Sequence, residues 1–362
     1  MKSQSIAGPA RAHRAWLVGI AAVSALALAA CGSSSSSSST SSSSSSAAAA
    51  SSGTSTAAAS SSAASAKNIT IALVPGLTVD PFYITMHNGA EAEAKALGVN
   101  LTWQGGTTFS PTTQIPVVNS LLAEKPSALL IAPTDVNALK APIQKFVSAG
   151  IPVIAVDTTI NDTSLLTSRI TSNNIQGGAA AADTIAKLAG DKGDVAVDNV
   201  NPGISTTDAR QAGFIAEMKK YPKMSVVATE YNNDSATTAE SQVRNLLLAH
   251  PGLVGVFATN LYGAQGAGAA IAADGKKGKV FVAAYDAEPA TVALLKSGVI
   301  NVLVVQQPAV EGKDAVLFAY DKLTGKASQI PKSVLVPNVV ATTATASEPS
   351  VSKYYYESSL SG

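Results

Sequence analysis

Cysteine is almost absent from this chain of 362 residues, because Cys31 is the only one. A single cysteine excludes an intrachain disulfide and a metal centre built from several cysteines. The three histidines, His13, His87 and His250, are too far apart in sequence to show the spacing of a metal site or of a catalytic triad. No cofactor and no metal are therefore expected.

Charge is also scarce, at 14% of residues, and the formal net charge is +1. Three basic residues, Lys2, Arg11 and Arg14, precede every acidic residue of the chain, and without them 22 basic residues face 24 acidic ones, a net charge of −2. Nucleic-acid binding would require a basic footprint, which this balance does not provide. Aromatic residues make up only 5%, so the few that fall in loops stand out.

The first 30 residues have the layout of a secretory signal peptide. A basic start is followed by an uncharged apolar run, Leu17–Ala30, which is shorter than the about 20 residues of a spanning helix. The run ends in Leu28-Ala29-Ala30-Cys31, which resembles the lipobox of bacterial lipoproteins. That resemblance implies that Cys31 is lipidated and anchors the chain to the extracytoplasmic face of the cell membrane, at the cell surface or in the periplasm.

Residues 31–66 continue from this cysteine as a tract of serine, alanine and threonine. The tract has no charge and no large apolar side chain, so it cannot bury enough surface to offset the entropy of ordering. We expect it to serve as a tether. The folded part is expected to begin near Lys67.

Beyond Lys67, apolar strands alternate with helices, which predicts a parallel sheet covered on both faces. The first helix is expected over Pro81–Leu97, with Asp80 as N-cap and Gly98 after its end. Another is expected over Thr112–Glu124, where Pro116 should delay its start or kink it.

After about residue 172 the alternation restarts, which predicts an α/β fold of two doubly wound lobes joined by a three-strand hinge. The chain is expected to cross between lobes near Thr171–Asn174, Gln306–Pro308 and Leu335–Pro337. The expected first lobe is 67–172 plus 307–335, the second is 173–306 plus 336–346, and 347–362 is a tail. No role follows from the sequence for the three tyrosines in that tail.

The prominent polar residues follow the ends of predicted strands, where ligands of open α/β sheets bind. Carboxylates, amides and a guanidinium can each make several hydrogen bonds to vicinal hydroxyls, and aromatic rings can cover the C–H face of a sugar. The candidates from the first lobe are Asp80, Phe82, Tyr83 and Asp157, and those from the second are Arg210, Asn260, Asp286 and Gln306.

Six stretches taken together and in order resemble a type I periplasmic binding protein of the ribose-binding class, the solute receptor of a sugar ABC importer. The resemblance covers roughly residues 69–345. The stretches are Ile71-Ala72-Leu73-Val74, Asp80-Pro81-Phe82-Tyr83, Ile131-Ala132-Pro133-Thr134-Asp135, Gly150-Ile151-Pro152-Val153-Ile154, Ala209-Arg210-Gln211-Ala212-Gly213-Phe214 and Ala249-His250-Pro251.

The resemblance implies that all eight candidates bind the ligand, with Asp80 in the place of an asparagine. The family's ribose binders carry an arginine after the aspartate of the fourth strand, where this chain has Thr158, which we include as a ligand-binding candidate. A second departure is Tyr231-Asn232-Asn233-Asp234, which does not align without a gap and leaves the second-lobe aromatic wall undefined. These changes favour another sugar or an acyclic polyol over ribose.

The resemblance implies a non-enzymatic, monomeric receptor that captures a small neutral carbohydrate or polyol and delivers it to an ABC permease. The alternative is a sensor that reports a sugar or signal molecule to a membrane receptor. A sugar-responsive repressor would need a DNA-binding helix pair before the fold, where a leader and tether stand instead. A glycosidase using Asp157 and Asp286 would need room for a chain substrate and a water.

Overall fold

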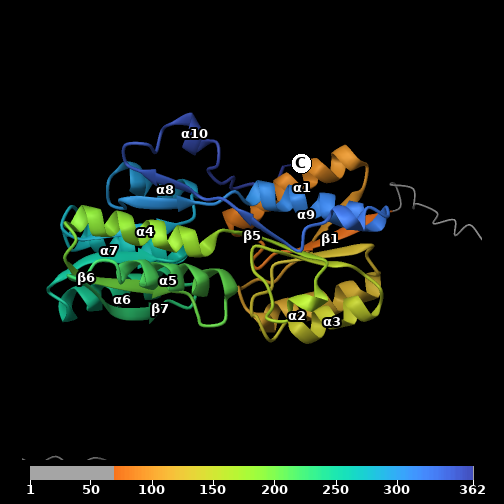
Figure 1. Ribbon diagram of the computed structural model, residues 1–362, viewed down its shortest axis with the longest axis horizontal. Helices are drawn as coiled ribbons and strands as arrows, with labels where there is room; N and C mark the ends of the chain where they lie inside the picture. The colour runs from red at the N-terminus through yellow and green to blue at the C-terminus, as the bar shows by residue number, and fades with distance from the viewer. Residues whose placement is uncertain (1–68, 362) are drawn as a thin grey trace, which may run out of the picture. The chain divides into compact units, whose positions relative to one another are not determined.

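The computed structural model describes residues 69–361, which form two α/β lobes (Figure 1). The leader, Cys31 and the tether lie outside the described residues. Within residues 69–361, no helix is both long and apolar enough to cross a membrane.

The first lobe is built on a six-stranded, fully parallel sheet with the order β11-β5-β4-β3-β1-β2. Its strands are β1 (Thr70–Val74), β2 (Asn100–Trp103), β3 (Ala128–Ile131), β4 (Val153–Val156), β5 (Ser168–Ser172) and β11 (Ser333–Val336). Its helices are α1 (Pro81–Leu97), α2 (Pro111–Glu124), α3 (Lys140–Ser148) and α9 (Pro308–Leu323), with short 3-10 turns at Thr163–Leu165 and Ala327–Gln329.

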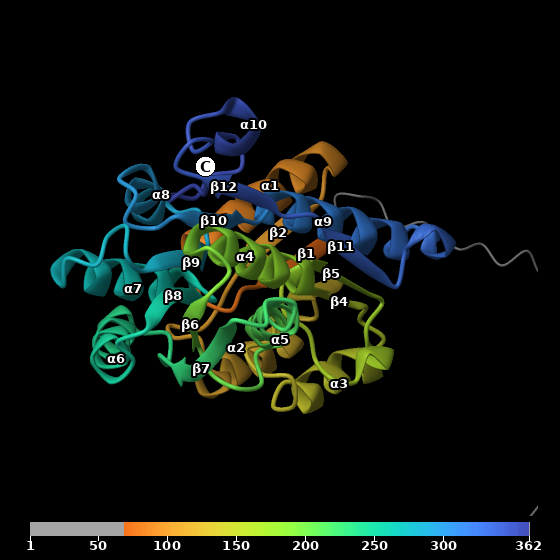
Figure 2. The ribbon, with the colours of Figure 1, turned by 60° about the vertical axis from the view of Figure 1, so that its left-hand side comes forward.

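The alternation of side chains along β1 shows how both faces of this sheet are buried. Ile71 and Leu73 pack in the core that contains α1 and α9, whereas Ala72 and Val74 pack in the core that contains α2 and α3. Figure 2 shows α1 and α9 on one face of the sheet, and α2 and α3 on the other. Burial on both faces explains why these strands are continuously apolar.

The second lobe has a six-stranded sheet with the order β12-β10-β9-β8-β6-β7. Its strands are β6 (Gly193–Asn199), β7 (Met224–Tyr231), β8 (Leu253–Ala258), β9 (Phe281–Tyr285), β10 (Val302–Val305) and β12 (Val339–Thr342), the last antiparallel to β10. Its helices are α4 (Asn174–Ala189), α5 (Ser205–Met218), α6 (Ala236–Ala249), α7 (Leu261–Ala273) and α8 (Pro289–Lys296). The two doubly wound lobes confirm the predicted fold class.

The chain crosses between the sheets three times: between β5 and α4, between β10 and α9, and between β11 and β12. A short helix, α10 (Pro349–Ser352), follows β12. The chain then runs toward α1, so that its C-terminal end lies beside that helix in both views (Figures 1 and 2).

Several helix ends differ from those expected. Asp80 caps α1 and Gly98 ends it in the left-handed conformation, which confirms both predictions. The prediction that Pro116 delays the start of the helix is wrong. α2 starts at Pro111, with Ser110 as its N-cap, and continues through Pro116. Pro116 is the sixth residue of the helix, so α2 lacks the one bond that an N–H at this position would donate to Thr112 O, and the helix continues on its remaining bonds.

Helix pairs in both lobes approach backbone to backbone at glycines, as α1 and α9 and α4 and α5 show. A Cβ on Gly89 of α1 would lie 2.1 Å from Ala309 O of α9, and one on Gly178 of α4 would lie 2.0 Å from Arg210 O of α5. Both contacts are too short for any side chain, so these positions admit glycine alone. The α4·α5 contact also fixes the backbone of Arg210, a candidate binding residue.

Candidate functional site

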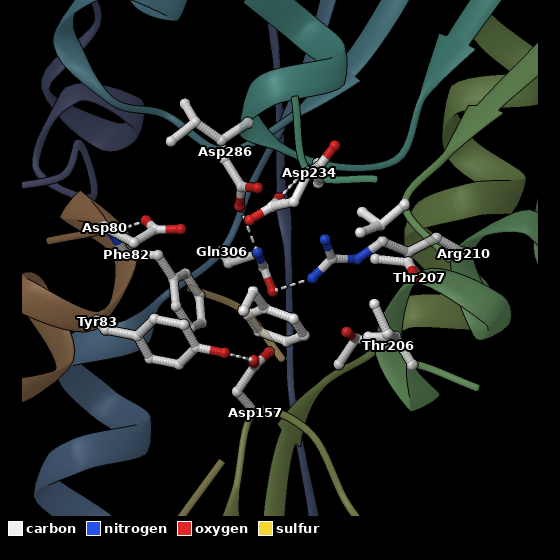
Figure 3. Close-up of a pocket in the computed structure, with 15 residues that line it drawn as sticks. Asp80, Phe82, Tyr83, Asp157, Thr206, Thr207, Arg210, Asp234, Asp286 and Gln306 are labelled. Atoms are coloured by element: carbon white, nitrogen blue, oxygen red, sulfur yellow. Dashed lines mark hydrogen bonds between the residues drawn. The ribbon is translucent and has the colours of Figure 1, made fainter. Parts of the chain in front are cut away.

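The candidate residues meet around one cavity between the two lobes, whose volume including its opening is about 440 Å³. Figure 3 shows side chains from both lobes pointing into it. The lining residues are Asp80, Phe82, Tyr83, Phe109, Asp157, Val200, Ile204, Thr206, Thr207, Arg210, Asp234, Asn260, Leu261, Asp286 and Gln306.

The first lobe contributes a wall with the rings of Phe82 and Tyr83, two carboxylates and, from the loop before α2, the ring of Phe109. Phe82 and Tyr83 lie in the first turn of α1, with ring centroids 5.1 Å apart and planes at 89°. Asp80, which caps that turn, accepts a bond of 2.8 Å from the backbone N–H of Phe82. Asp157 follows β4 with φ at 58° and accepts a bond of 2.6 Å from the Tyr83 hydroxyl.

Arg210 on α5 is the cation of the second-lobe wall, and three neutral acceptors hold it. Its Nε donates to Asn174 Oδ1 at 2.8 Å, its Nη1 to Thr259 O at 2.8 Å, and its Nη2 to Gln306 Oε1 at 2.7 Å. The guanidinium also lies 4.0 Å from the centroid of the Tyr285 ring. These contacts fix its orientation while its remaining N–H groups stay available to a ligand.

Gln306 connects Arg210 to a carboxylate. Its Nε2 donates to Asp286 Oδ1 at 2.6 Å while its Oε1 accepts from Arg210 (Figure 3). Gln306 lies directly after β10, at the second crossing between lobes, and Asp286 follows β9 with φ at 75°. A hydrogen-bonded chain therefore runs from α5 through the crossing to the end of β9.

Asn260 and Asp234 complete this wall. Asn260 caps α7 by accepting from Gly263 N at 3.0 Å, and its Nδ2 donates to Asp234 Oδ1 at 2.8 Å. Thr206 and Thr207 line the cavity from the start of α5. The Thr207 hydroxyl is buried and has no hydrogen-bond partner in residues 69–361, which leaves it free for a ligand.

The cavity holds four carboxylates but only one guanidinium. None of the ion pairs found in the described part of the chain includes Asp80, Asp157, Asp234, Asp286 or Arg210. Burial raises the pKa of Asp157 to about 6, partly opposed by the charge of Arg210. Burial, with the negative charge of Asp286, also raises the pKa of Asp234 to about 6.

The pKa values of the other two carboxyls move in the same direction. Burial raises the pKa of Asp80 well above its usual value, and the charge of Asp286 adds to this shift. Burial raises the pKa of Asp286 itself, against the opposing effect of Arg210 and of its hydrogen bonds. The site therefore has one cation, Arg210, beside four carboxyls and is rich in acceptors, and hydroxyl donors would satisfy it.

Eight of the nine sequence-predicted ligand-binding residues line this cavity; Thr158 does not. Thr158 is buried, and its hydroxyl has no hydrogen-bond partner in the described residues. The chain turns at Asp157, which has a left-handed backbone, so the aspartate faces the cavity and its neighbour lies outside the lining. The inclusion of Thr158 rested on the resemblance, because Thr158 stands where the family's ribose binders carry an arginine.

Sequence reasoning missed Phe109, Thr206, Thr207 and Asp234. Asp234 belongs to Tyr231-Asn232-Asn233-Asp234, the segment that did not align with the family. Its φ is 59°, so a left-handed turn places its side chain at the cavity, and this turn is not evident from the sequence. Tyr231 does not line the cavity, and Phe109 comes from the loop before α2. The threonines at the start of α5 were detectable, because Arg210 lies one turn further along the same helix.

The residues of the cavity can hold a polyhydroxyl solute but show no arrangement for a metal. Within residues 69–361, no group of three or more His, Cys, Asp or Glu side chains is placed to bind a metal ion. Carboxylates that accept, amides that both donate and accept, and aromatic faces match the alternating C–H and O–H surface of a sugar ring.

Comparisons with known proteins agree with this geometry. A family model described as a periplasmic binding protein domain matches residues 71–327. The ribose import binding protein of Bacillus subtilis is 32% identical over 273 residues, which cover 75% of this chain and 86% of that protein.

Two solved structures extend the likeness to three dimensions. One is an ABC transporter solute-binding protein from Agrobacterium vitis bound with alpha-D-tagatopyranose, at 42% identity and TM-score 0.78, covering 80% of this chain and 99% of that one. The other is a carbohydrate transporter solute-binding protein from Agrobacterium radiobacter in complex with D-arabinose, at 33% identity and TM-score 0.75, covering 79% and 98%. The chain belongs to the family of periplasmic binding proteins, the solute-binding components of transporters.

Proposed function

We propose that this protein captures a neutral monosaccharide in the interlobe cavity and delivers it, as a membrane-anchored lipoprotein, to an ABC permease. The observation that carries the proposal is the hydrogen-bonded chain from Arg210 through Gln306 to Asp286, opposite the rings of Phe82 and Tyr83. Such a chain fixes donors and acceptors in place before the ligand arrives, which lowers the cost of ordering them.

The chemistry of the site favours a pentose or hexose in its ring form. The four carboxylates need donors, which ring hydroxyls supply, and the aromatic side chains supply a flat apolar surface for the C–H face. The relatives point the same way, since their names or bound ligands are ribose, D-arabinose and alpha-D-tagatopyranose. The 42% identity to the tagatose-bound protein places ketohexoses first among the sugars to test.

A thermal-shift screen followed by calorimetry tests this function. The purified domain from residue 67 onward would be screened against D-tagatose, other ketohexoses, aldohexoses, D-arabinose, D-ribose, inositols and acyclic sugar alcohols. A ligand present at 100 times its Kd adds about 2.7 kcal/mol to the free energy of unfolding. If no monosaccharide or polyol raises the unfolding temperature, while the protein unfolds cooperatively, the proposal is wrong.

Membrane attachment through Cys31 is a separate part of the proposal, supported by the lipobox-like end of the leader. Cys31→Ser should release a soluble protein that still binds sugar, because stable anchoring needs acyl chains on this residue. Membrane fractionation of intact cells measures this. A Cys31→Ser variant that still sediments with membranes would contradict lipid anchoring and leave sugar binding unaffected.

Closure of the lobes is the expected signal to the permease. Asp80 and Asp157 come from one lobe, Arg210 and Asp286 from the other, so one small ligand can contact both sets only when the lobes are close. The ligand then shifts the population toward the closed form by its differential affinity. Small-angle scattering should show a smaller radius of gyration with sugar than without, and an unchanged radius at saturation would contradict closure.

A further inference from the structure

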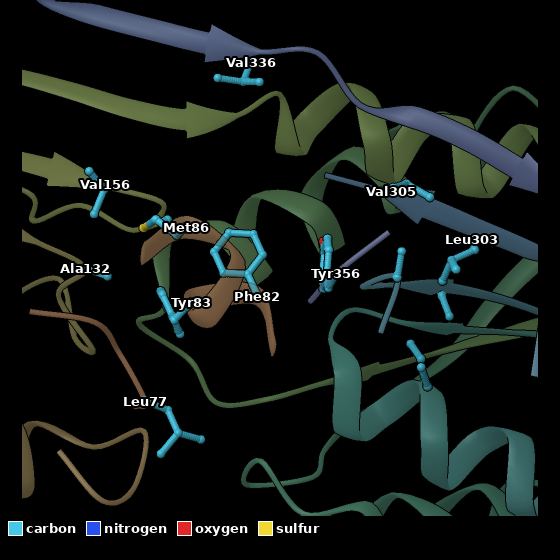
Figure 4. Packing of buried hydrophobic residues seen from close by; sticks show 14 of the residues in the cluster. Leu77, Phe82, Tyr83, Met86, Ala132, Val156, Leu303, Val305, Val336 and Tyr356 are labelled. Atoms are coloured by element: carbon cyan, nitrogen blue, oxygen red, sulfur yellow. The ribbon is translucent and has the colours of Figure 1, made fainter. Parts of the chain in front are cut away.

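The segment that follows α10, residues 353–361, contacts both lobes and two of the binding residues, Asp286 and Phe82. One of its residues, Tyr356, is 5% exposed. Figure 4 shows its ring among buried side chains of both lobes, with Phe82 on one side and Val305 on the other. Burial of a large aromatic residue here requires the segment to be held at both ends.

The second lobe holds the start of the segment. The backbone N–H of Tyr356 donates to Ala287 O at 3.0 Å, directly after the binding residue Asp286. The Tyr355 hydroxyl donates to Ala346 O at 2.5 Å, outside the cavity lining. These contacts fix where the Tyr356 side chain enters the space between the lobes.

The first lobe holds the rest of the segment through α1. The backbone N–H of Glu357 donates to Thr85 Oγ1 at 2.8 Å, and the backbone N–H of Ser361 donates to Asn88 Oδ1 at 2.7 Å. Asn88 Nδ2 donates in turn to Ser359 O at 3.0 Å and to the Glu357 carboxylate. Thr85 and Asn88 belong to α1, the same helix as Phe82 and Tyr83, so the segment is hydrogen-bonded to the helix that provides these two aromatic rings.

Tyr356 contacts one binding residue from each wall. Its hydroxyl donates to Asp286 Oδ1 at 3.2 Å, the oxygen that also accepts from Gln306 Nε2. Its ring meets that of Phe82 edge to face, with centroids 5.7 Å apart and planes at 73°. Tyr356 does not itself line the cavity.

We propose that Tyr356 is a positioning residue of the binding site and that residues 353–361 form a fourth connection between the lobes, which favours the closed arrangement. The proposal deepens the proposed function and rests on it. A second donor on Asp286 Oδ1 restricts the carboxylate to one orientation, and a ring behind Phe82 fixes the aromatic wall. Opening the lobes must break the contact with Ala287 or those with α1.

The first test separates positioning from folding. Tyr356→Phe keeps the ring against Phe82 and removes only the hydroxyl, and the matched control Tyr221→Phe loses one hydroxyl that donates to Asp183 Oδ1, outside both the segment and the cavity lining. We expect Tyr356→Phe to weaken sugar binding three- to tenfold by calorimetry, and Tyr221→Phe to change it less than twofold. Equal affinity in Tyr356→Phe and the wild type would overturn the positioning role.

The titration of Asp286 provides a readout that needs no ligand and that a merely structural role would not move. The groups around Asp286 that carry or can carry charge are Arg210, Asp80, Asp157 and Asp234, and none of them changes in Tyr356→Phe. Losing a donor to the ionised carboxylate should raise the pKa of Asp286, as followed by carbon NMR of its side chain. If the titration of Asp286 is the same in Tyr356→Phe and the wild type, the hydrogen bond from Tyr356 is contradicted, whether or not any sugar binds. If no sugar in the screen binds, only the proposed function is contradicted.

The connection to α1 is tested separately by Asn88→Ala, which removes the contacts with Ser359, Ser361 and Glu357 far from the cavity lining. We expect affinity to fall two- to fivefold, the sugar-free protein to show a larger radius of gyration, and the Asp286 titration to stay unchanged. The control Asn119→Ala changes an exposed asparagine on α2. If Asn88→Ala and Asn119→Ala match in affinity and radius, the fourth connection does not favour closure.

Discussion

The two walls of the cavity hold their buried polar side chains in place in different ways. On the second-lobe wall, Arg210 has three protein partners and Gln306 bridges it to Asp286. On the first-lobe wall, Asp80 accepts one hydrogen bond from the Phe82 amide and Asp157 accepts one from the Tyr83 hydroxyl. The second wall is a connected network, whereas the first consists of two local pairs beside aromatic rings.

This difference predicts how each wall responds to change. Within a network, removing one member leaves several buried groups unpaired, and each unpaired group costs about 1–3 kcal/mol. Removing one member of a local pair leaves a single partner, which water or the ligand can satisfy. Substitutions in the second wall should therefore cost more affinity than those in the first.

The largest effect is expected for Arg210→Ala. It leaves Asn174 Oδ1, Thr259 O and Gln306 Oε1 without their donor and removes the only cation among four carboxylates. Calorimetry should show affinity lower by about 2–4 kcal/mol, roughly thirty- to several-hundred-fold. Unlike a residue that only faces the cavity, Arg210 also stabilises the fold, so the unfolding temperature should fall too.

The control for this loss is Arg244→Ala, which removes a half-exposed arginine paired with Glu240 and Asp274 on the surface. Its effect on affinity should be undetectable, because surface ion pairs contribute little. If Arg210→Ala costs no more affinity than Tyr83→Phe, the second wall is not a network and the comparison fails.

The next effect is a dependence of affinity on pH that originates in Asp157 and Asp234, whose pKa values are both raised to about 6. Because the folded-state pKa of Asp157 is raised to about 6, its protonated carboxyl stabilises the sugar-free fold below about pH 4, and this contribution is lost as the pH rises through about 6. Sugar hydroxyls favour the ionised form, so binding should release protons below pH 6. Affinity should rise about tenfold between pH 5 and pH 7, and then level off.

Asp157→Asn tests this assignment, since the amide still accepts from Tyr83 but no longer titrates. Its affinity should vary with pH less than that of the wild type, leaving the part that comes from Asp234, whose pKa is also raised to about 6. Asp191→Asn, at an exposed turn, is the control and should keep the wild-type profile. Calorimetry in two buffers of different ionisation enthalpy counts the protons released, and none at pH 5.5 would contradict the prediction.

Much of the fold was predictable because its local signals agree with its global plan. The cap at Asp80, the proline after it and Gly98 define the ends of α1. Continuously apolar strands predicted sheets that are covered on both faces. The missed features depend on tertiary context. In β11, Ser333 and Leu335 are exposed, Leu335 at 59%, so this strand does not show the continuous burial of the central strands.

The site was predictable where residues follow strand ends in register, as Asp157, Asp286 and Gln306 do. It was not predictable where the chain returns from far away in sequence. Tyr356 comes from beyond the last strand, after α10, and no local period or spacing connects it to the cavity. Asp234 follows the end of β7 through a left-handed turn, so the position after a strand could have indicated it, but the sequence of this loop did not align with the family.

The smallest effect is expected on the first wall, for Tyr83→Phe. This change keeps the ring beside Phe82 and removes the single hydroxyl that donates to Asp157 Oδ2 at 2.6 Å. Because Asp157 faces the cavity, a sugar hydroxyl or water can take the vacant place, so the loss should be about 1 kcal/mol, roughly fivefold in Kd. The pKa of Asp157 should rise, because the Tyr83 bond lowers it, and the pH profile should move upward with it.

Calorimetry across pH resolves both parts of this last prediction, and Tyr221→Phe again controls for the loss of a hydroxyl outside the cavity. A hundredfold loss in Tyr83→Phe would mean that the first wall depends on its hydroxyl as strongly as the second wall depends on Arg210. The division into a network and local pairs would then be wrong, and the cavity would act as one coupled unit whose two halves cannot be weakened independently.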